Sequence, residues 1–206
     1  MKKSLEVKVL LCYNVGIFHY EKFFLRGWDD MISEKMEQLL NEQIQKEFYS
    51  AYLYLSFEAY FTSRNLNGFA NWFRIQAMEE RDHAIIFINY LNLVGGRVKL
   101  QALQAPEWDF NSIEQVLEKA LAHEEYVTKS IYNIADQAMD ERDHKTGSFI
   151  KWFIDEQAEE EDNAQQNLSK IRLVGEDDGR GILMLDAEFA ARVYTVPSPL
   201  ASNEQA

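Results

Sequence analysis

Four glutamates and one histidine lie where the sequence pattern of a helix bundle calls for apolar side chains. They are Glu47, Glu80, His83, Glu124 and Glu160. A buried carboxylate is strongly destabilising unless a partner neutralises its charge. Four carboxylates directed into one layer of a helical core therefore favour bound cations. The sequence predicts a pair of metal ions held inside a four-helix bundle.

The Glu80-x-x-His83 motif places a carboxylate and an imidazole one turn apart on the same helix face. The motif alone is common, and its weight comes from the glutamates on the other helices. Di-iron carboxylate bundles use a Glu from each of two helices and Glu-x-x-His from each of the other two. Here Gln157 and Glu160 stand in place of the second Glu-x-x-His. Such ligands suit iron in both oxidation states, and two irons bridged by Glu80 could together supply two electrons to O₂.

Each of these residues also has a purely structural interpretation. A single inward glutamate usually packs its stem and extends its carboxylate to solvent, but four at one depth make that explanation insufficient. A lone His83 would more often be a hydrogen-bonded core residue, and its spacing from Glu80 is what favours a ligand. Tyr54, one heptad after Glu47, fits a hydrogen-bonding or redox neighbour of the site and a packed aromatic equally well.

Further carboxylates flank the inward positions of two helices. Glu79 precedes Glu80, and Glu156 and Glu159 lie beside Glu160. A run of charges is usually a solvated helix face. Because these three glutamates adjoin the inward positions, they also predict a further cation site next to the pair.

The elements that must position these side chains are helices. Inward residues recur at alternating steps of four and three, which predicts four long helices and a short fifth one. Their expected ranges are 32–62, 68–94, 111–140, 146–174 and 182–193. Ser33 is the expected N-cap of the first helix. The stretch before the third helix contains Pro106 and shows no period, so we expect an all-α, ferritin-like four-helix bundle with a long crossover between its second and third helices and a short fifth C-terminal helix.

Composition limits the partners of the chain. With a net charge of -13, it repels nucleic acid and anionic membrane surfaces and attracts cations. Its single cysteine, Cys12, excludes an intrachain disulfide and a cysteine-rich metal site. No apolar run of about 18 residues is present, so no membrane-spanning helix is expected.

The chain is expected to hold one domain with a further segment at each end. The helical pattern opens at Met31, so residues 1–30 are predicted to be an N-terminal extension, either disordered or arising from a start placed upstream of the native one. The domain is expected to span 31–194. Residues 195–206 are polar and contain Pro197, and we predict that they form a disordered tail.

Three stretches, at residues 41–50, 79–83 and 155–161, form a specific combination with Glu124. In this combination the helical region 31–193 resembles the non-haem bacterial ferritins, and the resemblance implies a ferroxidase centre. One iron would be held by Glu47, Glu80 and His83, and the other by Glu80, Glu124 and Glu160, with Gln157 close by and Tyr54 next to the centre.

The resemblance also implies a third iron site, made by Glu79, Glu156 and Glu159, which share Glu160. It implies a homo-oligomeric, hollow shell of about 24 chains in the cytoplasm, with the fifth helix lining the four-fold axes. Such a shell takes Fe(II) and O₂ as substrates, oxidises the iron to Fe(III) and stores a ferric mineral. No haem is expected, because Arg81 stands where the haem-binding relatives have methionine and because the second Glu-x-x-His is missing.

Two other functions fit the same helices. A shell subunit could store iron without oxidising it, although catalytically silent ferritin chains lose several of the ligands that are present here. A di-iron oxidase or peroxidase could act on another substrate without forming a cage. A particle of about two chains would favour the oxidase, and one of about 24 chains would exclude it.

Overall fold

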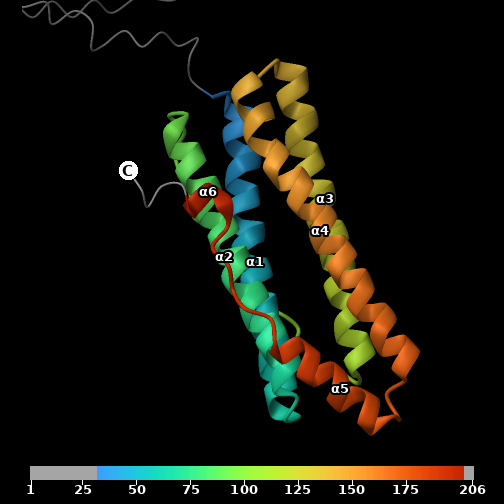
Figure 1. Ribbon diagram of the computed structural model, residues 1–206. Helices are drawn as coiled ribbons and strands as arrows, with labels where there is room; N and C mark the ends of the chain where they lie inside the picture. Colours follow the sequence, from blue (N-terminus) through green and yellow to red (C-terminus); the bar gives the residue numbers. More distant parts are fainter. Residues whose placement is uncertain (1–31, 202–206) are drawn as a thin grey trace, which may run out of the picture. The chain divides into compact units, whose positions relative to one another are not determined.

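The computed structural model describes residues 32–201 (Figure 1). The predicted N-terminal extension and the last residues, 202–206, lie outside the described part of the chain. Over the described residues the fold is all-helical, as predicted. The helices are α1 (Glu34–Ser63), α2 (Asn67–Leu93), α3 (Ile113–Glu141), α4 (His144–Val174), α5 (Gly179–Ala190) and α6 (Ser198–Ala201). Among these described helices, none combines the length and apolar character needed to cross a bilayer.

The four long helices pack as two antiparallel pairs. α1 lies beside α2 and α3 lies beside α4, and short turns at residues 64–66 and 142–143 join the members of each pair. The connection over residues 94–112 contains no helix and returns the chain from the end of α2 to the opposite end of the bundle, where α3 begins (Figure 1). This connection confirms the predicted crossover, and the resulting arrangement lets every long helix direct one face inward.

Side-chain caps set several of the helix starts. The Ser33 hydroxyl accepts a hydrogen bond from the Met36 backbone N–H at 3.0 Å, which confirms Ser33 as the N-cap of α1. Asp143 caps α4 in the same way. The fifth helix begins at Gly179, earlier than the sequence pattern predicted, because Asp178 caps its first turn.

The start of α2 is capped by another helix and not by a local residue. Its N-cap residue, Leu66, makes no side-chain capping bond. Instead, the Asp186 carboxylate of α5 accepts hydrogen bonds from the backbone N–H groups of Gly68 and Phe69 at 2.7 and 3.0 Å. A Cβ atom at Gly68 would lie only 1.6 Å from the Asp186 carbonyl oxygen. Glycine is therefore required at this position for α5 to dock against α2.

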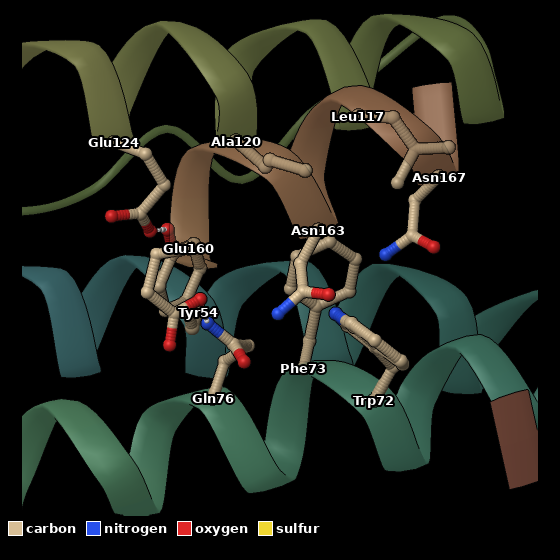
Figure 2. A pocket seen from close by; sticks show the side chains of 11 residues that line it. Tyr54, Trp72, Phe73, Gln76, Leu117, Ala120, Glu124, Glu160, Asn163 and Asn167 are labelled. Atoms are coloured by element: carbon tan, nitrogen blue, oxygen red, sulfur yellow. Dashed lines mark hydrogen bonds between the residues drawn. The ribbon is translucent and has the colours of Figure 1, made fainter. Parts of the chain in front are cut away.

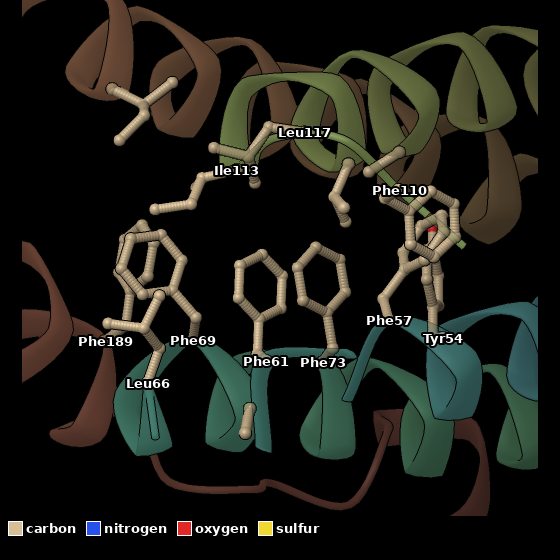
Figure 3. Packing of buried hydrophobic residues seen from close by; sticks show 14 of the residues in the cluster. Tyr54, Phe57, Phe61, Leu66, Phe69, Phe73, Phe110, Ile113, Leu117 and Phe189 are labelled. Carbon is tan, nitrogen blue, oxygen red and sulfur yellow. The ribbon is translucent and has the colours of Figure 1, made fainter. Parts of the chain in front are cut away.

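Two hydrophobic clusters fill the bundle, one toward each end. The aromatic cluster lies beside α5 (Figure 3), where Phe61 and Phe73 stack at 5.6 Å between ring centroids and Phe189 of α5 meets Phe69 edge-on at 4.7 Å. The opposite cluster begins with Met36 near the start of α1. Burial of this apolar surface is the main source of the stability of the bundle.

A layer of buried polar side chains separates the two clusters. On α1, Ile44 belongs to the opposite cluster and Leu53 to the aromatic cluster, and Glu47 lies between them. In the other three helices, a buried polar residue likewise lies between one residue of each cluster. These sets are Ala77, Glu80 and Ile86 on α2, Ala120, Glu124 and Val127 on α3, and Phe153, Gln157 and Leu168 on α4. The inward carboxylates therefore lie at one level of the core, as the sequence pattern predicted.

The described chain after α5 returns along α2. Residues 191–197 run back along α2, where the Asn71 side chain donates to the Arg192 carbonyl oxygen at 3.0 Å and the Tyr194 hydroxyl donates to Asp82. The short helix α6 follows and packs against α2. The two hydrogen bonds fasten the segment just before residue 195, and α6 supplies the contact with α2 beyond it.

Candidate metal centre

Two neighbouring helices bring together three of the predicted ligands. Glu47 of α1 and Glu80 and His83 of α2 each place a ligand atom within 4.8 Å of the other two. Each of these residues is only 1% exposed. The His83 Nδ1 atom lies 3.7 Å from Glu80 Oε2, as expected for residues one turn apart on a helix. The group offers two carboxylates and one imidazole to a single point in the core.

Part of this group lacks a partner within the protein. Among the described residues, none forms a hydrogen bond with Glu47 Oε2, Glu80 Oε1 or His83 Nε2, although all three atoms are buried. Buried polar atoms in native proteins are nearly always paired, because an unpaired one costs about 1–3 kcal/mol. A bound cation would satisfy atoms that converge in this way. The residues present therefore fit a divalent metal ion with oxygen and imidazole ligands.

Glu124 of α3 and Glu160 of α4 are buried in the same layer, but both Glu124 oxygen atoms and one Glu160 oxygen atom already have donors (Figure 2). The Tyr54 hydroxyl donates to Glu124 Oε1, and the Gln157 amide nitrogen lies 3.3 Å from Glu124 Oε2. The Gln76 amide nitrogen donates to Glu160 Oε2 at 2.8 Å. Within residues 32–201, these two carboxylates do not join the group formed by the first three ligands. Neutral hydrogen-bond donors hold them instead.

Burial and neighbouring charges favour protonated carboxyl groups in this layer. Burial raises the pKa of Glu47 to about 8, and the nearby Glu80 carboxylate adds to the shift. Burial also raises the pKa of Glu124 to about 8, with the Glu160 carboxylate as the second cause. The pKa of Glu80 lies well above its ordinary range because of burial and then of Glu124. Since a metal ion binds ionised carboxylates, its binding would release these protons.

The carboxylates predicted for a third cation lie at the edge of the layer. Glu156 Oε1 is 4.0 Å from His83 Nε2, and Glu159 is exposed. Glu79 forms an ion pair with Arg192, whose Nη2 atom lies 2.6 Å from Glu79 Oε2. Burial raises the pKa of Glu79 to about 7, and the Arg192 charge opposes that shift. In the described part of the chain, these carboxylates do not converge as the first three ligands do.

The helices and the buried layer match a known family. Residues 37–174, which include nearly all of α1 and the whole of α2 to α4, match the family model described as a ferritin-like domain. The chain belongs to the ferritin family. A bacterial non-heme ferritin of Staphylococcus aureus (strain USA300) is 35% identical over 164 residues, which cover 80% of this chain and 98% of that protein. One of Campylobacter jejuni is 39% identical over 156 residues, which cover 76% of this chain and 93% of that protein.

Solved ferritin structures share the same fold. The open-pore ferritin of the hyperthermophilic archaeon Archaeoglobus fulgidus is 45% identical, with a TM-score of 0.77 over 79% of this chain and 98% of that one. An engineered closed form of the Archaeoglobus fulgidus ferritin is 44% identical, with a TM-score of 0.78 over 80% of this chain and 99% of that one. Since the alignments include nearly all of each relative, the similarity extends over the whole ferritin bundle.

Two glutamines that were not among the predicted site residues also lie in the buried layer of this ferritin. Gln43 of α1 donates to Glu47 Oε1 at 2.8 Å, and Gln76 of α2 donates to Glu160. Each glutamine precedes a predicted ligand of its own helix by one turn, since Gln43 is followed by Glu47 and Gln76 by Glu80 at the i, i+4 spacing. That spacing places them on the inward face and is the signal that could have identified them.

Proposed function

We propose that this chain is the subunit of an iron-storage ferritin that oxidises Fe(II) with O₂ in the buried layer. The observation that carries the proposal is the group of Glu47, Glu80 and His83, whose unpartnered atoms converge inside a ferritin-like domain. Its curated relatives are bacterial non-heme ferritins, which supports iron storage and the expectation that no haem takes part.

In this proposal, the two iron ions share one carboxylate. Glu47, Glu80 and His83 would hold the first ion, and Glu80, Glu124 and Glu160 the second, with Gln157 nearby. Each Fe(II) loses one electron, and O₂ takes both electrons with two protons to give hydrogen peroxide and two Fe(III). The protein binds and orients the substrate ions, whose charge replaces the protons that burial favours on Glu47 and Glu124. The Fe(III) then hydrolyses to an oxo-hydroxide mineral.

Tyr54 would act as a positioning residue for the second ion. Its hydroxyl donates to Glu124 Oε1, so it fixes the rotamer of a proposed ligand. Burial, together with the charge of Glu124, raises the pKa of Tyr54 well above its ordinary value. The hydroxyl therefore keeps its proton and its role as a donor at neutral pH.

A third cation, held by Glu79, Glu156 and Glu159 with Glu160, extends the proposal. Arg192 would compete with such an ion, because its guanidinium already pairs with Glu79. Binding of the third ion would therefore require the Arg192 side chain to move away. We expect this site to fill after the pair.

We also propose that the chains assemble into a homo-oligomeric shell of about 24 copies in the cytoplasm and keep the ferric mineral inside it. Ferritin relatives at 35% to 45% identity support this assembly. Sedimentation of the purified protein tests it directly. A particle of about two chains would contradict the shell and favour a cage-free oxidase.

The oxidation itself is tested by adding about two Fe(II) per chain to the metal-free protein in air and following absorbance by stopped flow. We expect a rapid phase that saturates at about two irons per chain, followed by a stable ferric signal. Oxidation no faster than in buffer would contradict the ferroxidase and would leave a storage shell without a catalytic centre.

A further inference from the structure

Gln43 and Gln76 each donate to a carboxylate of the buried layer, and the surroundings of the two amides differ. The Gln43 amide nitrogen donates to Glu47 Oε1 at 2.8 Å, and the Ser130 hydroxyl donates to Gln43 Oε1 at 2.6 Å. The Lys46 ammonium in turn donates to Ser130 Oγ at 2.5 Å. Both ends of the Gln43 amide thus have partners, and this network fixes the orientation of Glu47 from within the chain.

Gln76 makes the corresponding contact on the other side of the layer. Its amide nitrogen donates to Glu160 Oε2 at 2.8 Å, and the residue is 4% exposed. Its carbonyl oxygen, Oε1, is buried and receives no hydrogen bond from any residue that the structure describes. The amide cannot be reversed to correct this, because Oε1 would then face the Glu160 carboxylate and two acceptors repel. The Gln76 carbonyl therefore needs a donor from outside the chain.

A small cavity lies directly beside Gln76 (Figure 2). Its volume is about 20 Å³, and a buried water molecule needs roughly 10–15 Å³ and two to four polar partners. Asn163 and Asn167 of α4 supply side-chain amides to its wall. Asn167 is 3% exposed, and its amide makes no hydrogen bond within the described chain. The cavity therefore has the size and the polar wall of a water site.

We propose that Gln76 is a positioning residue for Glu160 and that the cavity beside it binds one water molecule, which donates to Gln76 Oε1. The water fixes the Gln76 amide, and the amide nitrogen fixes Glu160 Oε2. The other carboxylate oxygen of Glu160 is then free to face the second ion. This inference rests on the proposed function, because it treats Glu160 as a ligand of that ion.

The two glutamines allow a matched test by anaerobic Fe(II) titration calorimetry of the assembled, metal-free protein. Methionine has nearly the length of glutamine and no strong hydrogen-bonding group, so Gln76→Met and Gln43→Met remove the hydrogen bonds while keeping most of the volume. We expect Gln76→Met to weaken binding of the second ion about 10–100-fold, the usual effect of removing a hydrogen bond to a metal ligand. Binding of the first ion should be unchanged. Gln43→Met should weaken the first ion instead.

The outcomes separate this inference from the proposed function. Wild-type protein that binds no pair of ions would contradict the proposed function itself. A wild-type pair that Gln76→Met leaves unchanged in both affinities would overturn the positioning role. If Gln76→Met and Gln43→Met weakened both ions alike, Gln76 would be acting only through the stability of the bundle, and the inference would be wrong.

A second variant tests the water molecule without altering Gln76. Asn167→Leu replaces one amide of the cavity wall with an apolar side chain of similar size, so it should exclude the water and weaken the second ion by a smaller factor than Gln76→Met. Crystal structures of both proteins at high resolution would show the difference. We expect ordered density within hydrogen-bonding distance of Gln76 Oε1 in the wild type and none in Asn167→Leu. An empty cavity in the wild type would overturn the water site.

Discussion

The two sides of the buried layer hold their carboxylates in different ways. On the side of α1 and α2, Glu47, Glu80 and His83 converge and keep unpartnered atoms directed at one point. On the side of α3 and α4, Glu124 and Glu160 accept hydrogen bonds from neutral side chains. The first side thus has the geometry of a cation site, whereas the second side has carboxylates whose charge is satisfied locally.

This difference has a physical reason and a consequence for metal binding. The α3–α4 side contributes two carboxylates and no imidazole, and their mutual repulsion helps to raise the pKa of Glu124. Neutral donors such as Tyr54 stabilise these groups without adding charge. Because both Glu124 oxygen atoms already accept hydrogen bonds, a cation on this side must share them with neutral donors, whereas the α1–α2 side offers unpartnered atoms. We expect the first ion to bind more tightly than the second.

Removing the shared ligand should weaken metal binding on both sides of the layer. Glu80→Ala deletes the carboxylate that both ions use, so we expect binding of the pair to weaken by more than about 100-fold and the rapid oxidation to disappear. Glu58→Ala is a suitable control, because Glu58 lies on α1 and pairs with Arg74 at the surface. Rapid oxidation that survives in Glu80→Ala would place the centre elsewhere.

Variants that remove a ligand from only one side of the layer should affect the binding of one ion more than that of the other. His83→Ala should weaken the first ion, and Glu124→Ala the second, each by at least about 10-fold, while circular dichroism shows the helices intact. Both variants should slow the rapid phase in stopped flow. Glu125→Ala, at the exposed neighbour of Glu124, provides the control. Unchanged rapid kinetics in both variants would refute the site assignment, and equal loss of both ions in each variant would refute the division into sides.

The stability of the metal-free protein should fall as the pH rises. The pKa values of Glu47 and Glu124 are about 8 in the folded protein, above the ordinary value of 4.5. Between these values the folded state binds more protons than the unfolded state, so the stabilisation is complete below the unfolded pKa and is lost as the pH passes the folded pKa. Each pKa unit corresponds to about 1.4 kcal/mol. Thermal unfolding at a series of pH values measures the slope.

A glutamine variant isolates this effect from the general repulsion within an acidic protein. Glu124→Gln cannot titrate, so its unfolding temperature should fall less steeply between about pH 5 and pH 8 than that of the wild type. The exposed Glu125→Gln should follow the wild type. Parallel pH profiles for Glu124→Gln and the wild type would mean that the Glu124 carboxyl is already ionised in the folded state.

A smaller effect is expected from the tyrosine that holds Glu124. Tyr54→Phe removes one hydroxyl and leaves the ring in the aromatic cluster, so the fold should remain stable. Glu124 would lose a donor, and we expect the second ion to bind about 10-fold more weakly, the lower end of the range for such contacts. Anaerobic titration measures this change. Loss of the first ion instead would show that Tyr54 acts across the layer.

The smallest effect concerns the edge of the layer. Arg192→Gln should release Glu79 from its ion pair and strengthen binding of a third cation by a few-fold, because a competing positive charge has gone. A matched control is Arg172→Gln, which removes an exposed ion pair with Glu114 far from the layer. Metal counting by equilibrium dialysis would detect the change, and weaker third-ion binding in Arg192→Gln would show that Arg192 supports the site.

The residues of the layer show how much the sequence could predict. Glu47, Glu80 and Glu124 were predicted to face inward from helical periodicity alone, and the structure buries all of them. The contact between Gln76 and Glu160 was not predictable, because it joins α2 to α4 and depends on which side chains meet across the core. Local spacing reports the face on which a residue lies and not the partner that it finds there.

The ends of the bundle also show which features local sequence predicts and which depend on contacts between distant segments. The N-cap role of Ser33 follows from its place just before a periodic stretch, and the structure confirms it. The cap of α2 comes from Asp186, more than a hundred residues later, and the ion pair of Glu79 comes from Arg192. No local pattern connects residues so distant, since the chain segment after α5 acquires these partners only when it packs against α2.

The sequence by itself determined the helices, the long crossover and the depth at which the carboxylates lie, because each of these follows from periodicity, caps and breaks along one segment. The tertiary structure alone decided which carboxylates converge, which are held by neutral donors and which is paired with an arginine. Hydrogen bonds and ion pairs act over a few ångströms. Their choice among many polar residues therefore depends on distances between helices that no single segment contains.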